Sequence, residues 1–500
     1  MKQGDPLIRV CSLDYSYTSS IFPGKKALQG ISLEIYPGET VLIAGPSGSG
    51  KSTLIKCLNG LIPNSGKGKM TGKVFINGMD TSVHSVPEIS RVSGYVFQNP
   101  DYQIITNEVD SEIAFGPEQA GIPPEDIEKR ISRVTNLLGI THLRGRETTA
   151  LSWGEMQKVA IASVLVMEPK ILLMDEPFSG LDSESASYLL GIIRDISKSG
   201  RIATVIIEHR ADMALSSVNR LVALNSGQII YDGPACACPD DIIEKMDGGY
   251  DLPSTQSGKN YGVSSPGFAG VSFGKQDNKP SVVLRDVSYH YPGSSSDALC
   301  CVNVSFYPYE IVAVCGANGS GKSTLAKHIN GLLKPDSGEV YIFDENIGGK
   351  TVAEVARYVS LVSQHADSQL FEETIERELS FGPKNLGFDE RETGMSVDEV
   401  MELVGISHLG KGARPLKLSV GEKQRVAIAS HLTMKAPVVI MDEPTLGLDL
   451  PLKKRLAETL ISMKKEGKCI IIITHDMRFA DFCADRKYFC ENGRISCINN

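Results

Sequence analysis

Two phosphate-loop motifs, 271 residues apart, limit most strongly how this chain can fold. The first is Gly45–Thr53, with the sequence GPSGSGKST, and the second is Gly316–Thr324, with the sequence GANGSGKST. Both fit the pattern G-x-x-x-x-G-K-[ST], in which glycines let backbone N–H groups point at phosphate oxygens. The lysine of the pattern reaches the β and γ phosphates, and the hydroxyl can bind Mg²⁺. Since such a loop joins a strand to a helix, we expect two α/β domains.

The likeness between the two halves extends far beyond these loops. Paired residues recur in the same order at offsets of 266 to 271: Lys51 and Lys322, Gln98 and Gln364, Ser152 and Ser419, Glu176 and Glu443, Asp182 and Asp449, His209 and His475. A repeat of this length predicts two copies of one domain rather than a solenoid array. We expect domains at 7–246 and 281–500. Between them, 247–280 is rich in Gly, Ser, Pro and Asn and is expected to be a flexible linker.

Short uninterrupted apolar runs, many of them β-branched, alternate with helical patterns in both halves. They lie at 41–44, 171–174, 204–207, 311–314, 438–441 and 470–473. Such runs are typical of strands buried on both faces of a parallel sheet. The expected fold class is therefore α/β.

Composition narrows the range of functions. The net charge of −9 argues against a nucleic-acid-binding surface. The eleven cysteines include no C-x-x-C pair and are interpreted as reduced thiols of a cytoplasmic protein. No apolar run approaches the roughly 18–20 residues that a membrane-spanning helix needs. Any membrane role is therefore expected to work through a partner protein.

An Asp-Glu-Pro sequence follows one apolar run in each half. Asp175 and Asp442 lie where the second ligand of Mg²⁺ is found beside a phosphate loop. Glu176 and Glu443 come next, at the carboxyl end of the predicted sheet, where open α/β folds bind their ligands. A carboxylate there can orient and deprotonate the water that attacks the γ-phosphate. The alternative is that each glutamate only neighbours a helix N-cap.

Histidine and glutamine recur after two further runs in each half. His209 and His475 each follow a strand-like run, and their repetition favours a γ-phosphate contact over a purely structural role. Gln98 and Gln364 also follow apolar runs, and their amides can meet Mg²⁺ or the attacking water. As single residues the glutamines would be weak indicators.

A Leu-Ser-x-Gly-Glu sequence opens a predicted helix in each half, at Leu151–Glu155 and Leu418–Glu422. A serine at a helix start, with exposed N–H groups behind it, is suited to bind an anion. The simpler interpretation is an ordinary helix N-cap.

The order of these motifs in each half resembles that of the nucleotide-binding subunits of ABC transporters. The order is phosphate loop, glutamine, Leu-Ser-x-Gly-Glu (the signature), Asp-Glu-Pro, Leu-Asp and histidine. The resemblance implies two tandem P-loop ABC-type ATPase domains, each with a mostly parallel core sheet, an antiparallel β subdomain and a helical subdomain. It also implies that two such domains pair head to tail, with ATP between the phosphate loop of one and the signature of the other. Whether the halves pair within one chain or with a second copy of it stays open.

The resemblance assigns roles to individual residues, with ATP and Mg²⁺ as cofactors. The implied catalytic residues are Glu176, Glu443, His209, His475, Gln98 and Gln364. The implied Mg²⁺ ligands are Ser52, Gln98, Asp175, Ser323, Gln364 and Asp442. The implied ATP-binding residues are Tyr17, Gly45, Pro46, Ser47, Gly48, Ser49, Gly50, Lys51, Ser52, Thr53, Ser152, Gly154, Glu155, Tyr291, Gly316, Ala317, Asn318, Gly319, Ser320, Gly321, Lys322, Ser323, Thr324, Ser419, Gly421 and Glu422.

One signature residue departs from the family pattern in each half, and the role of one tyrosine in each half stays open. Trp153 and Val420 stand where the signature usually has glycine, so a bulky side chain either crowds the closed interface or points away. Tyr17 and Tyr291 match the aromatic residue that stacks on adenine, but each could instead be a tyrosine on a strand face.

The segment after each glutamine narrows the subfamily. Gln-x-x-Asp-x-Gln at 98–103 and 364–369, and the Phe-Gly-Pro sequences at 115–117 and 381–383, resemble the ATPases of energy-coupling-factor importers. The resemblance implies ATP-driven uptake of a vitamin, metal ion or similar micronutrient. Its implied partners are an integral-membrane T-type subunit and a substrate-binding membrane subunit, so the chain would be peripheral to the cytoplasmic face of the membrane. The alternative is a soluble tandem ABC ATPase that acts on the ribosome or nucleic acid; negative charge and the lack of a zinc-ligand cluster argue against it.

Overall fold

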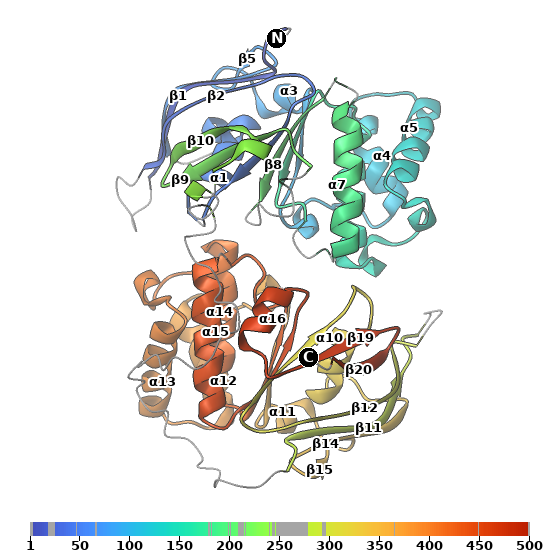
Figure 1. Cartoon of the computed structure of the whole chain (residues 1–500), viewed down its shortest axis with the longest axis vertical. Helices are drawn as coiled ribbons and strands as arrows, with labels where there is room; N and C mark the ends of the chain where they lie inside the picture. Colours follow the sequence, from blue (N-terminus) through green and yellow to red (C-terminus); the bar gives the residue numbers. More distant parts are fainter. Residues whose placement is uncertain are drawn as a thin grey trace. The chain divides into compact units, whose positions relative to one another are not determined.

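The computed structural model divides the chain into two compact units, Met1–Tyr250 and Asp251–Asn500 (Figure 1). The structure describes residues 4–18, 26–46, 48–65, 68–178, 181, 183–198, 200, 202–208, 215, 217–239, 241–242, 246, 279–292, 297–364, 366–448 and 450–498. Of the predicted linker 247–280, only Lys279 and Pro280 lie among these residues. The linker and the domain boundaries therefore stay predictions.

The first unit is built on a six-stranded sheet in the order β10-β9-β3-β8-β7-β6. Only the β9–β10 pair is antiparallel; the other neighbours are parallel. The strands are β3 (Thr40–Ala44), β6 (Ser93–Val96), β7 (Ile171–Asp175), β8 (Ala203–Glu208), β9 (Arg220–Asn225) and β10 (Gln228–Pro234).

The two faces of this sheet pack into different cores. In β3, Val41 and Ile43 lie in a core shared with the antiparallel strands, whereas Leu42 and Ala44 lie in a core shared with the helices. Burial on both faces explains why the apolar runs in the sequence are uninterrupted rather than alternating. The expected strands in β3, β7 and β8 are confirmed.

A four-stranded antiparallel sheet covers one side of the first unit, in the order β2-β1-β4-β5. Its strands are β1 (Ile8–Tyr17), β2 (Lys26–Ile35), β4 (Gly68–Ile76) and β5 (Met79–Asp80). Its buried residues alternate along β1 and β2, as expected for strands with one solvated face. This sheet places Tyr17, the last residue of β1, near the phosphate loop.

Helices form the rest of the first unit. They are α1 (Lys51–Leu58), α2 (Leu61–Asn64), α3 (Val86–Ser90), α4 (Val109–Gln119), α5 (Pro124–Leu137), α6 (Trp153–Leu165) and α7 (Ser183–Lys198). Helices α4, α5 and α6 pack on one another as a helical subdomain. In α5, Ile127, Ile131 and Val134 share the buried face at helical spacing. The short helix η1 (Pro100–Tyr102) precedes α4.

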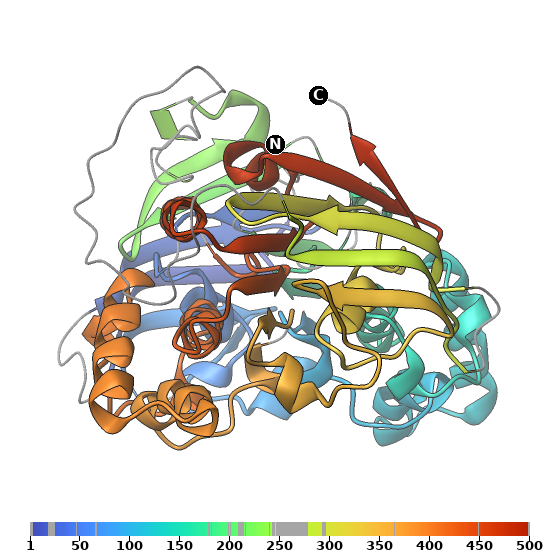
Figure 2. The same cartoon turned by 90° about the horizontal axis from the view of Figure 1, so that it is seen from below.

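The second unit repeats this arrangement. Its main sheet has the order β16-β17-β18-β13-β19-β20 and its antiparallel sheet the order β12-β11-β14-β15. Figure 2 shows the second unit in another view, in which its antiparallel strands are yellow and β19 and β20 are red. The main-sheet strands are β13 (Glu310–Cys315), β16 (Val359–Val362), β17 (Val438–Asp442), β18 (Cys469–Ile473), β19 (Arg486–Glu491) and β20 (Arg494–Ile498). The antiparallel strands are β11 (Val282–Tyr289), β12 (Leu299–Phe306), β14 (Ser337–Ile342) and β15 (Glu345–Asn346).

The helices of the second unit repeat those of the first, except that α2 and α16 have no counterpart among the described helices. They are α10 (Lys322–Ile329), α11 (Val352–Val355), α12 (Ile375–Leu386), α13 (Glu390–Leu403), α14 (Val420–Leu432), α15 (Leu450–Lys465) and α16 (Met477–Cys483). The predicted fold class is confirmed in both units: a mostly parallel sheet, an antiparallel sheet and a helical subdomain. Among the described residues, no helix has the length and apolar character needed to cross a bilayer.

Candidate active sites

The phosphate loop of the first unit depends on glycines that no other residue could replace. Gly45 and Gly50 have φ angles of 152° and 105°. A Cβ added to Gly45 would lie 2.1 Å from the carbonyl oxygen of Leu224, and one added to Gly50 would lie 2.5 Å from that of Ala27. Backbone therefore fills the space that a side chain would need. The second unit repeats this geometry at Gly316 and Gly321, with contacts of 2.2 Å and 2.3 Å.

The two lysines of the loops lie folded over their own loops. The Nζ of Lys51 donates hydrogen bonds to the carbonyl oxygens of Gly45 (2.6 Å) and Pro46 (2.9 Å). The Nζ of Lys322 does the same to Gly316 and Ala317, at 2.8 Å and 2.7 Å. Each lysine is also the first residue of a helix, α1 or α10, whose N-terminal N–H groups favour an anion. The loops therefore have the shape and charge that bind phosphate.

The buried aspartates that end β7 and β17 carry raised pKa values. Burial, and next the negative charge of Glu176, raise the pKa of Asp175 from 3.8 to about 6. Burial likewise raises the pKa of Asp442 to about 6, although a hydrogen bond from Ser323 opposes the rise. The Oδ1 of Asp175 is buried without a hydrogen-bond partner among the described residues. An unpartnered carboxylate oxygen beside a phosphate loop is a suitable ligand for Mg²⁺.

The two serines among the predicted Mg²⁺ ligands also suit a bound Mg²⁺ ion. Ser52 and Ser323 are the second residues of α1 and α10, and Ser323 is linked to Asp442 by a hydrogen bond. These donors are all oxygens, which Mg²⁺ prefers. When bound, Mg²⁺ would neutralise the charge of the buried carboxylates and of the phosphates. The described residues hold no cluster of three or more His, Cys, Asp or Glu side chains that could bind a metal ion.

Glu176 and Glu443 have an unusual backbone conformation. Their φ angles are 48° and 50°, in the left-handed region that residues other than glycine rarely adopt. The N–H of Glu176 donates to the carbonyl oxygen of Ile207 (2.9 Å), and that of Glu443 to Ile473 (2.8 Å). The central strands β8 and β18 therefore hold both glutamates in a strained position, which is a common feature of functional sites.

The two glutamate carboxylates accept hydrogen bonds from other predicted site residues. In the first unit, the Nε2 of Gln98 donates to Glu176 at 2.8 Å. In the second unit, the backbone N–H of His475 donates to Glu443 at 3.1 Å, and the Nδ1 of His475 lies 2.9 Å from the same oxygen. The structure thus brings each glutamate together with one of its predicted companions. His209 and Ser47 lie outside the described residues, and Gln364 lies half-buried two residues beyond β16.

Each signature serine caps the helix that it opens. Ser152 and Glu155 form a capping box at the start of α6, and the hydroxyl of Ser152 donates to Glu155 at 2.7 Å. Ser419 and Glu422 form the same box at α14, also at 2.7 Å. Both signature serines are exposed, so the capping role does not exclude anion binding. A Cβ at Gly421 would lie 2.9 Å from the carbonyl oxygen of Gly447, so this signature position requires glycine.

The predicted adenine-stacking tyrosines lie beside the phosphate loops. The Tyr17 hydroxyl lies 3.0 Å from the hydroxyl of Thr53, and Tyr291 lies 3.3 Å from Thr324. Each ring also contacts a second tyrosine edge to face, with ring centroids 4.9 Å apart. Both tyrosines therefore lie next to a phosphate loop, and their stacking on adenine stays a prediction.

The supporting contacts of several residues were not predicted from the sequence. The hydroxyl of Tyr95 donates to Asp175 at 3.2 Å. The Oε1 of Gln103 accepts from the N–H of Phe97 at 2.9 Å and holds the loop that carries Gln98. Glu112 accepts hydrogen bonds from the N–H groups of Ile105 and Thr106. The repetition of Gln103 as Gln369, and of Glu112 as Glu378, was the signal that could have found them.

Each unit combines a phosphate loop, a strand that ends in Asp-Glu and a signature helix. This combination defines an ABC-type ATPase. The chain belongs to the ABC transporter family, whose model matches residues 28–179 and 299–446. It is an ABC transporter ATP-binding protein with two such domains.

Relatives described as ABC transporter ATP-binding proteins match nearly the whole chain. One from Caldanaerobacter subterraneus is 34% identical and covers 99% of this chain and 91% of its own length. One from Clostridium perfringens is 33% identical and covers 94% and 87%. Another, from Methanosarcina acetivorans, is 31% identical and covers 99% and 86%.

Two solved structures are similar in part or in whole. The archaeal ribosome recycling factor aABCE1 is 21% identical, with a TM-score of 0.57, and covers 93% of this chain and 87% of its own; this likeness concerns the fold alone. The cbiO1 protein of Clostridium perfringens, part of the ABC transporter complex cbiONQ, is 32% identical. It covers 46% of this chain and 90% of its own, with a TM-score of 0.42.

Proposed function

We propose that this chain is the ATP-hydrolysing subunit of an energy-coupling-factor type importer, which drives uptake of a micronutrient through separate membrane subunits. Its position would be peripheral, at the cytoplasmic face of the membrane. ATP hydrolysis would use the sites described above, with the signature of one unit completing the phosphate loop of the other or of a second copy.

The residues of each site support a simple division of labour. Lys51 and Lys322 exchange their loop carbonyls for phosphate oxygens, and the glycine N–H groups bind the same phosphates. Glu176 and Glu443 accept the proton of the attacking water, and Gln98 and His475 orient the two carboxylates. The chemistry that Mg²⁺ would supply is neutralisation of the phosphate charge. Positioning and charge, rather than a covalent intermediate, thus account for the rate.

An exposed apolar pair at equivalent positions in both units is the observation that carries the coupling proposal. In the second unit, Phe371 and Phe381 are 59% and 46% exposed, and their rings meet edge to face at 4.8 Å. In the first unit, Ile105 and Phe115 take the same positions at 63% and 41% exposed. Exposed apolar side chains that recur at one place are typical of protein–protein contacts. We propose that each pair receives an apolar helix of the membrane subunit.

The exposed pairs adjoin the loops that carry the catalytic glutamines. Glu112 fixes the backbone of Ile105, and Glu378 fixes that of Phe371, at 2.9 Å and 3.0 Å. Gln103 ties the first of these loops to the residue before Gln98. A helix seated on Ile105 and Phe115 would therefore move with Gln98 and, through it, with Glu176.

The experiment that tests this proposal is a mass measurement of the intact complex, purified from membranes through a tag on this chain. We expect an integral-membrane subunit in the complex, and its loss when Ile105 and Phe371 are both replaced by serine. The isolated variant should keep its ATP hydrolysis, because neither residue lies in a site. A matched control is Val83→Ser, an exposed apolar residue elsewhere on the first unit.

A different result would favour the soluble alternative. Persistent co-sedimentation with ribosomes, together with the absence of any membrane subunit, would contradict the proposed function. Retention of the membrane subunit by the Ile105→Ser, Phe371→Ser chain would contradict the proposed docking pairs.

A further inference from the structure

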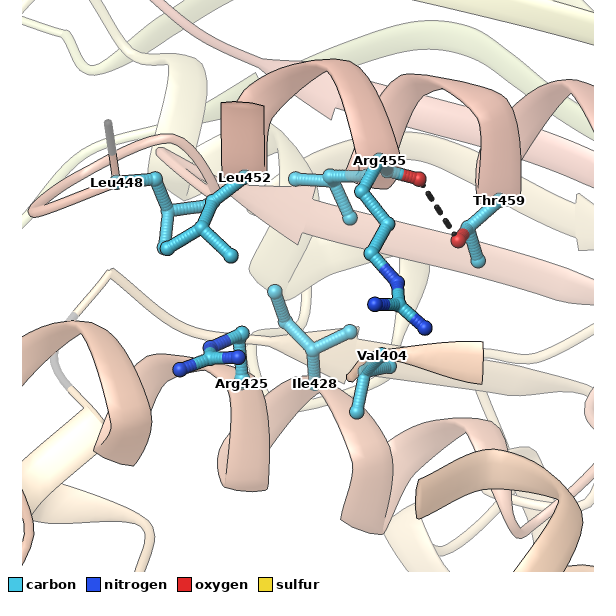
Figure 3. A pocket seen from close by; sticks show the side chains of 8 residues that line it. Val404, Arg425, Ile428, Leu448, Leu452, Arg455 and Thr459 are labelled. Carbon is cyan, nitrogen blue, oxygen red and sulfur yellow. Dashed lines mark hydrogen bonds between the residues drawn. The ribbon is translucent and has the colours of Figure 1, made fainter. Parts of the chain in front are cut away.

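A small cavity in the second unit lies between the signature helix α14 and helix α15, which follows the Asp-Glu-Pro strand (Figure 3). Its lining is mostly apolar, but two arginines take part in it: the lining residues are Val404, Arg425, Ile428, Leu448, Leu452, Arg455, Leu456 and Thr459. Guanidinium groups beside apolar side chains need hydrogen-bond acceptors close by. The hydrogen-bond partners of the two arginines show how α14 and α15 are connected at this cavity.

Arg455 connects α15 to the end of α13. Its Nη2 donates to the carbonyl oxygen of Glu402 at 2.6 Å, and its Nε donates to that of Leu403 at 3.2 Å. These are the last two residues of α13, whose carbonyl groups lack the usual donor four residues later, although Glu402 also accepts from the N–H of Gly405 at 3.1 Å. A cation is also favoured at a helix C-terminus. Arg455 therefore fastens α15 to the helical subdomain.

Arg425 connects the end of α13 to the signature. It lies on α14, and its Nη1 donates to the carbonyl oxygen of Gly405 at 2.8 Å, just beyond the end of α13. Its Nε donates to the carbonyl oxygen of the signature glycine, Gly421, at 3.3 Å. The two arginines thus link α15, the end of α13 and the start of α14, and we refer to Arg425 and Arg455 as the arginine joint.

The first unit has different residues at both positions. Lys158 corresponds to Arg425 and Tyr188 to Arg455, each 267 residues earlier in the sequence. The Nζ of Lys158 lies 5.4 Å from the centre of the Tyr188 ring. Tyr188 is exposed, as Arg455 is, but it has a single hydroxyl donor and cannot bind two carbonyl groups as a guanidinium does. Among the described residues, the Lys158–Tyr188 contact therefore stands where the second unit has the hydrogen bonds of Arg425 and Arg455.

We propose that Arg425 and Arg455 are positioning residues for ATP hydrolysis, which hold the signature Ser419–Glu422 of the second unit in a fixed orientation relative to α15. The signature Ser152–Glu155 of the first unit lacks this joint and turns more easily. The two ATP sites are therefore unequal, because each uses a different signature. This inference rests on the proposed ATP hydrolysis at both sites.

The experiment places the first unit's residue in the second unit, as Arg455→Tyr, in the full chain. Hydrogen exchange of backbone amides in 405–409 and 419–423 should accelerate about tenfold, because local opening becomes easier. The kcat for ATP should fall by about fivefold with KM changed by less than about twofold, since misplacement of the signature affects the transition state more than ATP binding. Arg455→Lys should recover part of the loss, because lysine keeps one donor but not the fork.

The controls separate a positioning role from a general loss of structure. Arg391→Ala removes an exposed arginine from α13, the helix whose end the arginine joint contacts, and should change neither exchange nor kcat. The reciprocal Tyr188→Arg should slow exchange in 139–143 and 152–156 of the first unit. Unchanged exchange in Arg455→Tyr, or an equal change in Arg391→Ala, would overturn the inference. A wild-type chain that hydrolyses no ATP would instead contradict the proposed function, and the exchange results would still support or overturn the joint.

Discussion

At the scale of single residues, each site combines strain with buried charge. Glu176 and Glu443 adopt positive φ angles, and the neighbouring aspartates are buried with pKa values of about 6. Neither feature stabilises the fold. Both are suited to a site that gains its favourable interactions only when Mg²⁺ and phosphate are bound.

Replacement of either glutamate by glutamine should stop the chemical step without disturbing the site. Glu176→Gln and Glu443→Gln keep the shape of the side chain and its acceptor oxygen but remove the base. Turnover should fall by about 100-fold or more at the altered site, and ATP should stay bound to the chain. Rapid filtration with radiolabelled ATP and a phosphate-release assay would measure both effects. A variant with full turnover would show that one of the two sites does not hydrolyse ATP.

Asparagine at Asp175 should stabilise the Mg²⁺-free protein in a pH-dependent way. The folded pKa of about 6 lies above the ordinary value of 3.8, so between these values the folded state binds more protons than the unfolded state. The free energy of unfolding therefore falls as the pH rises from about 4 to about 6. Asp175→Asn should raise it by about 2–3 kcal/mol at pH 7.5 and by about half of that at pH 5.

Urea unfolding at the two pH values, with Mg²⁺ removed by a chelator, measures this effect. Asp442→Asn should behave in the same way, because its pKa is raised for the same first cause, burial. The control is Asp101→Asn, since Asp101 is exposed. A stabilisation of Asp175→Asn that is equal at both pH values would argue against the raised pKa.

At the scale of elements, the loop after each catalytic glutamine differs between the units. Asp101 is exposed in η1, where the Asn99 side chain accepts its N–H at 2.8 Å. Asp367, its counterpart, forms an ion pair with Lys423 of α14 at 2.6 Å. The loop of the second unit is therefore tied to its signature helix through Asp367, whereas Asp101 is exposed in the first unit.

Substitution of these two aspartates should have different results. Asp101→Ala should impair transport and leave ATP hydrolysis within about twofold, because only an exposed side chain is lost. Asp367→Ala should lower both, since Lys423 loses its partner beside the signature. Parallel assays of uptake in membrane vesicles and of ATP hydrolysis would decide this. Equal loss of both activities in Asp101→Ala would count against a docking role for the first loop.

The apolar runs in the sequence were sufficient to predict the central strands, and the structure shows why, whereas the roles of the site residues stay predictions. Buried strands such as β8 and β18 leave uninterrupted apolar runs, and the phosphate loops require glycine where backbone carbonyls lie close. The arginine joint could not be predicted, because Arg455 bonds to carbonyl groups of a helix more than fifty residues away, and a carbonyl leaves no mark in the sequence. For Glu112, the repetition as Glu378 marked the residue, but the backbone N–H groups from which it accepts hydrogen bonds leave no mark in the sequence.

At the scale of the whole molecule, the duplication places two sets of predicted site residues in one chain. The relatives of similar length carry the same description, so this tandem form is not peculiar to one sequence. The predicted linker of 247–280 has a typical span of about 30–35 Å if flexible, at about 5–6 Å × √n. This span is compatible with pairing of the two halves within one chain.

Pairing within the chain predicts that specific ATP hydrolysis is independent of protein concentration. A chain that pairs only with a second copy would lose activity on dilution, because association follows mass action. Turnover per chain, measured from about 10 nM to 10 μM, should therefore stay constant. The mass of the Glu176→Gln, Glu443→Gln chain with ATP should correspond to one copy of 54.1 kDa. A doubled mass would assign the sites to two copies.

The left-handed backbone at Glu176 and Glu443 also bears on how such a protein responds to selection for thermal stability. Glycine at either position would relieve the backbone strain and remove a buried carboxylate, so it should raise the melting temperature. It would also remove the base from the site. Laboratory evolution that rewards heat resistance alone should therefore accumulate inactive chains at these two codons, unless each round also screens for turnover.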